Sequence, residues 1–459
     1  MERVSTPNQH AKFTSGSIVR HVFVMTATAS VGLLATFAVD MLNLLYISHL
    51  GVPEFTAALG FASTLLFFAL SISLGLTVPV TALIGHCLGS GDRQKAAETG
   101  GACMVYVGLV TVAFTVAIWP FLGSLLFMLG ARGDTLDLAR GFLNIVMPSI
   151  PLAGLGMCAT GILRGVGDAR LAMYVTLFSA VAAAILDPIF IFAFDLGLNG
   201  AAITTVLSRA VMLLIGWYGA HRVHGLVALP ARRRLKAAAV PFFEIAVPAI
   251  LAQFATPVGN AYLLAVLARS GDGAIVGMAV ISRLVPFVFV GLFALSGAVG
   301  PIFAQNLSAQ EHGRILETIR GSLVLSGIYV LVVWTLLAIF AHPIADLFEA
   351  EAMAREVILF FCWFVAGTYL FTAAIIVASA AFNNLGRPRL STLLNWARST
   401  IGVFPFVSTG AAYYGANGAL AGSAIGVALF GIIAIAWCHR VVNQMMGKGL
   451  VYPTTALGS

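Results

Sequence analysis

The residues most able to do chemistry in this chain are a few ionisable side chains inside long apolar stretches. Asp40 lies late in one such stretch, with Thr36 four residues before it and Asn43 three residues after it. These spacings place the three side chains on one face of a helix. A charge at the centre of a bilayer costs about 2.5–3.5 kcal/mol on insertion scales. We therefore interpret Asp40 as a carboxylate that faces a water-accessible cavity and binds a proton or a cation; the alternative is an acid that only hydrogen-bonds to a neighbouring helix.

A second acid, Asp187, is followed directly by a proline inside another apolar stretch. Pro188 removes one helix hydrogen bond and so frees a carbonyl group near the carboxylate. Irregular backbone at membrane depth normally lines a cavity. We predict that Asp187 is the partner of Asp40, with Thr204 and Thr205 of the next stretch as supporting polar groups. The alternative is an acid that is satisfied locally at a helix kink.

Further polar residues fall within the apolar stretches of the second half. We expect a substrate cavity there, with candidate lining residues Gln253, Asn260, Tyr262, Arg283 and Tyr369. Arg283 is open between a structural and a functional reading, whereas Arg209 and Arg398 are interpreted as structural. Each intramembrane arginine needs an acid, a backbone carbonyl or a route to the interface.

Signatures of catalysis and of metal binding are absent from the sequence. It contains no Walker loop, no G-x-S-x-G motif and no H-E-x-x-H motif. Its five cysteines are scattered and suggest neither a disulfide framework nor a zinc site. We expect no enzyme activity and no cofactor. An intramembrane enzyme or a non-transporting receptor is the rival class, but no nucleophile or metal cluster accompanies the acids.

Composition places the chain in a membrane. Hydrophobic residues make up 60%, charged residues 9%, and the mean hydropathy is +0.98. A helix needs about 20 apolar residues to span the bilayer core. We predict an all-α membrane protein whose twelve spans lie near 21–46, 55–84, 101–129, 138–162, 171–194, 200–220, 240–268, 274–304, 320–341, 356–382, 391–413 and 418–438.

The sequence also repeats itself. Three loop signatures recur in one order at an offset of 219 or 218 residues: Gly85–Ser90 with Ala304–Ala309, Gly167–Leu171 with Gly386–Leu390, and Gly197–Ala201 with Gly415–Ala419. A duplicated half in a membrane protein is typical of a transporter whose substrate path lies between the halves.

The basic residues predict the orientation. With the N-terminus in the cytoplasm, 18 of the 25 Lys and Arg residues fall on the cytoplasmic side, 4 fall outside, and 3 lie within spans. This asymmetry follows the positive-inside rule. We predict a multi-pass protein of the cell inner membrane with both termini cytoplasmic. The one dense cluster, Arg232–Arg234 with Lys236, is interpreted as a topology determinant beside anionic lipid rather than as a nucleic-acid site.

In these features the chain resembles the multidrug and toxic compound extrusion (MATE) family, over about residues 18–440. The motifs that carry the resemblance are Asp40 followed by Leu50-Gly51, Gly75-Leu76 leading to Gly85, Gly89–Asp92, Arg164–Asp168, Leu186–Pro188, Gly200–Ala202 and Phe382–Pro388. The last stretch and the acid at Asp187 are most similar to the DinF-like branch.

The resemblance implies two pseudo-symmetric six-helix bundles and alternating access coupled to H⁺ or Na⁺. We place a cytoplasmic segment at 1–20, a first lobe with the coupling acids at 21–221, a basic cytoplasmic linker at 222–239, a second lobe at 240–440 and a cytoplasmic tail at 441–459. The family's first-lobe acids map onto Asp40 and Asp187. The chain departs from the family at Ala183, where an asparagine is common, at 24–27, which lacks proline, and in the spans around Gln253 and Tyr369, which lack acids.

We therefore predict a multidrug antiporter, with H⁺ favoured over Na⁺, that exports organic and often cationic compounds. A monomer in the lipid bilayer is expected, with small molecules as its partners. The alternative is a flippase for lipids or lipid-linked oligosaccharides from the same superfamily. At offset 219, Asp40 aligns with Gly259 and Asp187 with Phe406. Only the first half keeps the acids, so we expect the coupling site there.

Overall fold

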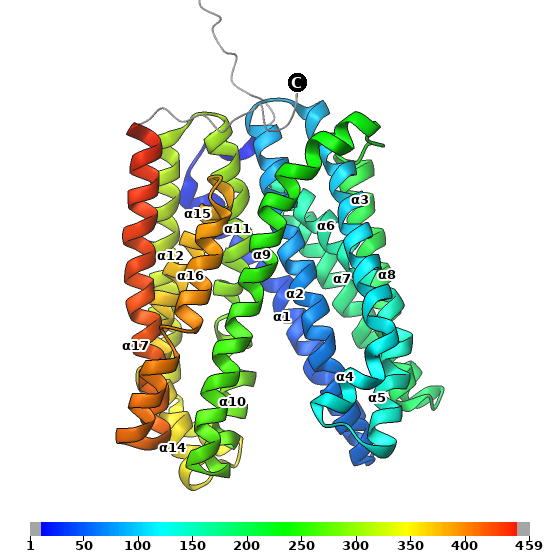
Figure 1. The fold of residues 1–459 in the computed structure, drawn as a ribbon, viewed down its shortest axis with the longest axis vertical. Coiled ribbons are helices and arrows are strands. Elements are labelled where there is room, and N and C mark those ends of the chain that lie inside the picture. Colours follow the sequence, from blue (N-terminus) through cyan, green and yellow to red (C-terminus); the bar gives the residue numbers. More distant parts are fainter. Residues whose placement is uncertain (1–10, 448–459) are drawn as a thin grey trace, which may run out of the picture. The chain divides into compact units, whose positions relative to one another are not determined.

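The fold is helical throughout the part of the chain that the structure describes. The computed structural model describes residues 11–447, and its regular elements in that range are all helices (Figure 1). The ends of the predicted cytoplasmic segment and tail, residues 1–10 and 448–459, lie outside the described residues. Among the described residues, eleven helical stretches are long and apolar enough to cross a membrane. The longest, Pro388–Met445, is a hairpin of two spans, so the prediction of a twelve-span all-α membrane protein is confirmed.

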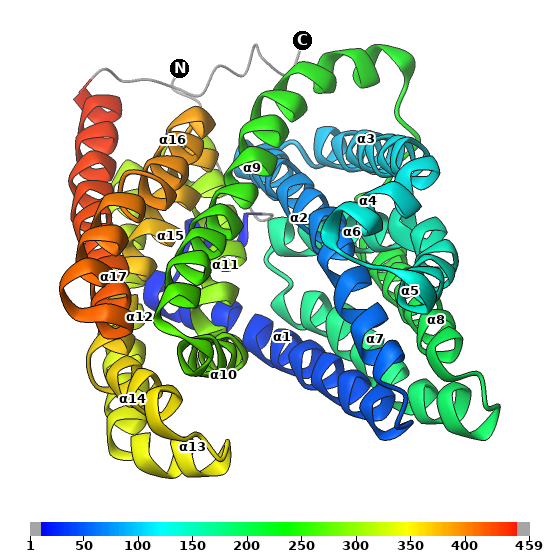
Figure 2. The same cartoon turned by 60° about the horizontal axis from the view of Figure 1, so that its bottom comes forward.

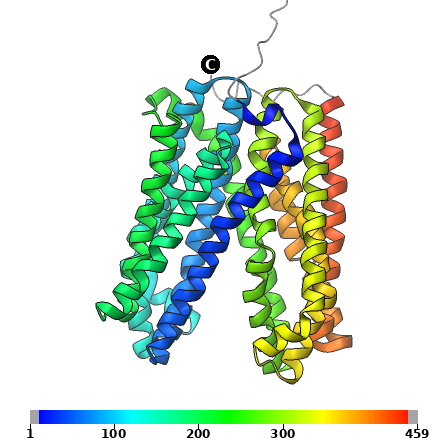
Figure 3. The same ribbon diagram turned by 180° about the vertical axis from the view of Figure 1, so that it is seen from behind.

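The chain divides into two compact units, and within the described residues the first is Thr28–Ala246. Helices α7 and α8 of this unit pack side by side along their length (teal to green in Figure 3), and α2 packs against α6. Its elements are α1 (Ile18–His49, from Thr28), α2 (Pro53–Gly89), α3 (Arg93–Ile118), α4 (Leu122–Leu129), α5 (Gly133–Val146), α6 (Ile150–Val166), α7 (Ala169–Pro188), the π-helix η4 (Ile189–Ala193), α8 (Gly197–Trp217), the π-helix η5 (Tyr218–Val223) and the start of α9 (Arg232–Leu267).

The second unit consists of Ala11–Ala27 and, among the described residues, 247–447. The short helices α13 and α14 follow α12 in this unit (yellow in Figure 2). Besides the remainders of α1 and α9, its helices are α10 (Asp272–Val288), α11 (Val290–Ser308), α12 (His312–Ile339), α13 (Ala341–Leu347), α14 (Ala352–Phe360), the π-helix η7 (Phe361–Val365), α15 (Tyr369–Asn384), α16 (Pro388–Ser399) and α17 (Phe404–Gly447).

The loop signatures of the first half are helix stop and start signals. Gly167 ends α6 in the left-handed conformation, and Asp168 then caps α7 by accepting a hydrogen bond from the Leu171 N–H at 3.0 Å. Asp92 caps α3 in the same way through the Lys95 N–H at 2.8 Å. An aspartate at this position satisfies one of the amide groups that a helix leaves unpaired at its start.

Backbone geometry records the duplication. Six positions with positive φ recur 218 to 220 residues later: Gly51 with Gly271, Gly91 with Gln310, Gly130 with Glu349, Gly133 with Ala352, Gly167 with Gly386 and Gly197 with Gly415. Three of the second-half partners are not glycine, although a side chain disfavours this conformation. The second half has therefore kept the turns after losing the residue that forms them most easily.

The hairpin within α17 depends on glycine contacts. Helical geometry breaks at Tyr414 and Gly415. On either side of this break the backbones touch: a Cβ added at Gly410 would lie 2.0 Å from the Gly418 carbonyl oxygen, and one added at Gly426 would lie 1.5 Å from the Gly402 oxygen. The contacting pairs are spaced symmetrically about residue 414, so the two arms run antiparallel and close together.

One close approach fixes the register of α1 against α7. A Cβ added at Gly32 would lie 2.0 Å from Thr176 Oγ1. No larger side chain fits without moving the helices apart or changing Thr176. Asn43 and Asp187 each lie eleven residues after this contact, on α1 and α7 respectively.

The second unit also holds the start of the described chain. The Phe13 N–H donates to Gln305 Oε1 at 2.9 Å, and Arg314 Nη2 donates to the Phe13 carbonyl oxygen at 2.8 Å. Phe13 itself is 1% exposed. The Gln305-Asn306 signature therefore anchors residues near Phe13 to the end of α11.

Part of the predicted basic linker, residues 222–239, is helical. Helix α9 begins at Arg232, so the cluster Arg232–Arg234 lies on the first helical turn and not in a loop. Before it, the Ala228 N–H donates to the Ala97 carbonyl oxygen at 3.1 Å, which holds the linker against α3. The hydrophobic pattern did not reveal this helical start because charged residues occupy it.

Replacing Ala352 by glycine is expected to stabilise the protein. Ala352 has φ 41°, a left-handed conformation that costs an alanine about 1–2 kcal/mol. Thermal unfolding in detergent should show a higher midpoint for Ala352→Gly. Ala354→Gly, two residues later in the first turn of α14, should lower it, since this change removes a buried methyl group and adds backbone freedom to the unfolded chain. Equal lowering by both substitutions would contradict strain at Ala352.

Gly32→Ala is expected to destabilise the first unit by about 1–3 kcal/mol, because the added methyl group overlaps Thr176 Oγ1. Combining it with Thr176→Ala removes that oxygen and should recover most of the lost thermal stability. Additive losses in the double variant would show that α1 and α7 do not approach at this point.

Candidate functional site

The centre of the candidate site is the Asp187 carboxylate. Asp187 is the penultimate residue of α7, and the helix continues after Pro188 as the π-helical turn η4. The residue is 1% exposed, and neither carboxylate oxygen has a hydrogen-bond partner of good geometry. Single π-helical turns occur frequently at functional sites. A buried carboxylate with unsatisfied oxygens is costly unless it is neutralised or receives a ligand.

Two polar side chains surround Asp187. Asn43 of α1 and Thr204 of α8 both interact with its carboxylate. Asn43 lies eleven residues after Gly32, and Asp187 lies eleven residues after Thr176, so one register sets both contacts and the helices run parallel. Thr204 is fully buried and also donates to the Gly200 carbonyl oxygen at 3.1 Å. Three helices thus converge on one carboxylate.

Asp40 is the accessible member of the pair. The Asp40 side chain is exposed, and it interacts electrostatically with Asp187 and with Arg209. The guanidinium of Arg209 is held in place by Ser149, whose Oγ accepts a hydrogen bond from Nη1 at 2.9 Å. The first unit therefore groups two acids and one base.

Arg209 is a residue whose place in this group the sequence analysis missed. It was interpreted as structural, and its hydrogen bond to Ser149 fits that reading, but it also attracts Asp40. Helical spacing alone does not predict this place: Arg209 shares a helix face with Thr205, four residues earlier, but the Thr205 hydroxyl bonds to its own helix.

Together, Asp40, Asp187 and Arg209 have the chemistry to bind and release one positive charge. Two nearby carboxylates repel each other when both are ionised, and the protons that they bind belong to the pair. Arg209 balances one negative charge. The remaining charge can be cancelled by a proton or a monovalent cation. Among the described residues, no cluster of three His, Cys, Asp or Glu side chains could hold a metal ion.

The hydroxyl groups of two predicted supporting residues donate hydrogen bonds within their own helices. Thr36 Oγ1 donates to the Gly32 carbonyl oxygen at 3.0 Å, and Thr205 Oγ1 donates to the Ala201 oxygen at 2.9 Å. Such bonds to the preceding helical turn are common for threonine in a helix. The structure brings Asn43 and Thr204 to Asp187, and it does not bring Thr36 or Thr205 there.

The candidate cavity residues of the second unit do not form one group. Tyr369 stacks on Phe289 with ring centroids 4.0 Å apart and lies near Arg398, while Tyr262 stacks on Phe404 at 4.1 Å. Gln253 is half-buried, and Asn260 and Arg283 are exposed. Arg283 was predicted to line the cavity and Arg398 was not. In the structure, Arg398 lies near Tyr369, which was also a predicted cavity residue.

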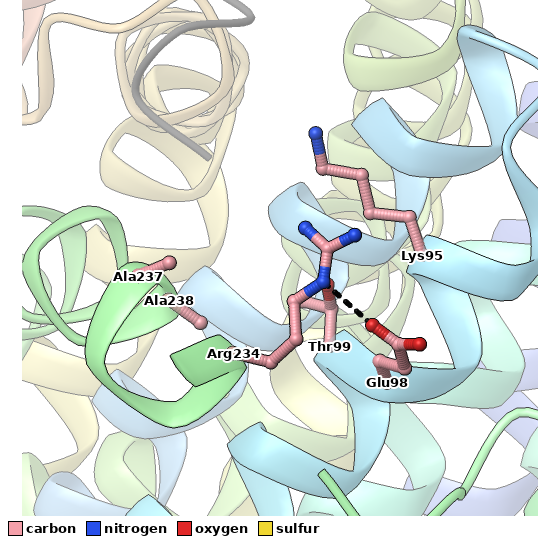
Figure 4. Close-up of a pocket in the computed structure, with 6 residues that line it drawn as sticks. All are labelled: Lys95, Glu98, Thr99, Arg234, Ala237 and Ala238. Atoms are coloured by element: carbon pink, nitrogen blue, oxygen red, sulfur yellow. Dashed lines mark ion pairs between the residues drawn. The ribbon is translucent and has the colours of Figure 1, made fainter. Parts of the chain in front are cut away.

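A separate pocket lies where α3 and α9 begin. Its lining residues are Lys95, Glu98, Thr99, Arg234, Ala237 and Ala238 (Figure 4). Arg234 Nε and Glu98 Oε2 form an ion pair at 2.6 Å, shown by the dashed line. This pair attaches the first turn of α9 to α3, and it involves neither Asp40 nor Asp187.

Comparison with known proteins identifies the architecture. The family model described as MatE matches residues 29–189 and again residues 248–407. The two matches begin 219 residues apart, which is the offset of the repeated loops, so the predicted duplication is confirmed.

Relatives and solved structures match along nearly the whole chain. A FAD transporter from Shewanella oneidensis is 26% identical over 94% of this chain and 96% of its own length. The multidrug export protein MepA of Staphylococcus aureus is 25% identical, covering 89% of this chain and 90% of its own. A Vibrio cholerae MATE transporter, VcmN, superimposes with a TM-score of 0.88 at 23% identity, over 93% of this chain and 97% of its own. A Pyrococcus furiosus transporter of the MOP superfamily gives 0.89 at 19%, over 96% and 100%.

These relatives are transporters, and they give no support to the flippase alternative. The DinF-like branch remains a prediction. With the family model matched twice, and with full-length relatives and two transporter folds alongside it, this chain belongs to the MatE family of multidrug efflux (MATE) transporters.

Proposed function

We propose that this protein is a proton-coupled antiporter that exports organic compounds, and that Asp40 and Asp187 bind the coupling proton. The observation that carries the proposal is the Asp187 carboxylate, which is buried and accepts no hydrogen bond of good geometry. Desolvation favours the neutral form of a carboxylic acid. A bound proton removes the burial cost and also the repulsion between Asp187 and Asp40.

The difference in exposure between the two acids suggests a route for the proton. Asp40 is exposed and exchanges protons first, while Asp187 is enclosed by α1, α7 and α8. Protonation changes the net charge of the pair and its attraction to Arg209. A conformational equilibrium between inward- and outward-open states then shifts by the difference in proton affinity between them. A cationic substrate competes for the same negative charge.

Sodium is the second candidate for the coupling ion. The Asp187 carboxylate and the Thr204 hydroxyl beside it offer oxygen atoms, which hard cations prefer as ligands. Against sodium, Ala183 replaces an asparagine that is common in the family and that would supply a further amide oxygen. Protonation of Asp187 needs no additional ligands, so we favour the proton.

The substrates are organic compounds of moderate size. The relatives named above transport FAD or export multiple drugs, so both flavins and organic cations are reasonable first substrates for this chain. Export from the cytoplasm across the inner membrane fits the predicted orientation with both termini inside.

Asp40→Asn is expected to abolish gradient-driven export while leaving the protein folded. Asparagine keeps the shape of the side chain but cannot exchange a proton. Ethidium transport into inverted proteoliposomes, driven by an imposed pH gradient, should fall to the level of empty vesicles. Asp187→Asn should behave in the same way.

Asp195→Asn is the matched control for both variants. Asp195 is an exposed acid beyond the end of η4, and asparagine also tolerates its left-handed backbone of φ 52°. It should transport at the wild-type rate. Wild-type transport by Asp40→Asn at normal thermal stability would reject the assignment of Asp40.

The wild-type protein is expected to respond to a pH gradient and not to a sodium gradient. Proteoliposomes with an imposed pH gradient in sodium-free buffer should transport ethidium. Vesicles at equal pH on both sides with a sodium gradient should not. Transport in the second condition alone would replace the proton by sodium as the coupling ion and leave the rest of the mechanism intact.

A further inference from the structure

The second unit contains an arginine inside a membrane span, and one of its hydrogen-bond donors has no acceptor. Arg398 lies in the last turn of α16, within the apolar stretch Pro388–Met445. Its Nη2 donates to Thr256 Oγ1 of α9 at 2.7 Å, whereas its Nε is buried and has no acceptor. Among the described residues, no carboxylate pairs with this guanidinium. A cation at this depth normally pairs with an acid or marks a substrate path.

The backbone next to Arg398 is interrupted. Helix α16 ends at Ser399 and α17 begins at Phe404, with non-helical residues between them. Ser399 is 1% exposed, and its hydroxyl has no hydrogen-bond partner. Interrupted helices at membrane depth are characteristic of substrate sites in transporters. Two adjacent residues with unsatisfied polar groups at one helix break indicate that a polar ligand group belongs here.

Aromatic rings lie beside this break. Tyr369 is close enough to interact electrostatically with Arg398, and it stacks on Phe289 with an interplanar angle of 2°. Tyr262 stacks on Phe404, the first residue after the break. Both tyrosines are half-buried, so part of each ring stays accessible. Rings of this kind stack on planar ligands.

We propose that the second unit binds planar aromatic compounds that carry a phosphate or carboxylate group, and that Arg398 binds the anionic group. This inference rests on the proposed export function and adds a substrate class to it. The guanidinium fork suits phosphate and carboxylate oxygens. Its hydrogen bond to Thr256 is exposed, so an incoming anion can reach Nη2.

The competing explanation is that Arg398 only fastens α16 to α9. Those helices have other contacts that do this: Trp396 Nε1 donates to the Leu251 carbonyl oxygen at 2.9 Å, and Thr392 Oγ1 donates to the Pro248 oxygen at 2.7 Å. A purely structural arginine would affect all substrates alike.

Two flavins that differ by one phosphate group provide the test. Flavin mononucleotide carries the phosphate, and riboflavin has the same ring system without it. Binding of each to the purified protein in detergent would be measured by fluorescence quenching, with ethidium as a cationic probe. Arg398→Gln should weaken binding of flavin mononucleotide about 10- to 100-fold, the loss expected for a charge-assisted hydrogen bond. Binding of riboflavin and ethidium should change less than about threefold, as the two lose no charged partner.

Three results would overturn the proposal: no binding of flavin mononucleotide to the wild type, equal affinity in Arg398→Gln, or a parallel loss for all three probes. If Arg398→Gln does not yield a monodisperse protein, Arg398→Lys serves instead. Lysine keeps the charge and loses the fork, so selective weakening of flavin mononucleotide supports the site, and unchanged affinity overturns it.

The coupling mechanism and this site can fail separately. Asp40→Asn should keep binding of flavin mononucleotide in detergent while losing gradient-driven transport. If the wild type shows no proton-driven transport but binds flavin mononucleotide through Arg398, the anion site stands and the coupling proposal fails. If transport is proton-driven but Arg398→Gln exports flavin mononucleotide normally, the reverse holds.

Discussion

The cost of placing a charge among apolar helices governs this structure. Asp187 has almost no exposure and no well-formed hydrogen bond, so its ionised form is costly unless a proton or a cation neutralises it. Arg209 compensates Asp40 from the neighbouring helix and is itself held by Ser149. In the proposed mechanism, an incompletely balanced pair of acids binds and releases a cation, which a permanent ion pair could not do.

The helices have local features that make this arrangement possible. Gly32 lets α1 approach Thr176, and the same register brings Asn43 to Asp187. Pro188 turns the end of α7 into a π-helical segment, against which Gly200 packs closely. The second unit keeps the turns of the first but has no acids at the positions that align with Asp40 and Asp187, and two of its unsatisfied polar groups, on Arg398 and Ser399, lie at the break after Ser399. The two halves therefore share their backbone turns but differ in the polar and charged residues that lie within their spans.

Much of the fold was predictable because it depends on local sequence. Long apolar runs predicted the spans, and the glycine-containing loops predicted the repeat that the two MatE matches confirm. The choice of Thr204 over Thr205, and the proximity of Arg209 to Asp40, were not predictable, since helical rotation and packing between distant segments decide them. The break after Ser399 was also missed, because Thr400–Val403 is as apolar as the helices around it.

Proton binding at Asp40 and Asp187 is tested most directly by following pH while substrate binds. Ethidium would be added to the purified wild-type protein in weakly buffered detergent that contains a pH indicator. Release of protons in proportion to bound ethidium, with or without sodium, is the predicted result. Saturation with ethidium without any proton release, or release of sodium in its place, would contradict a proton-binding acid pair.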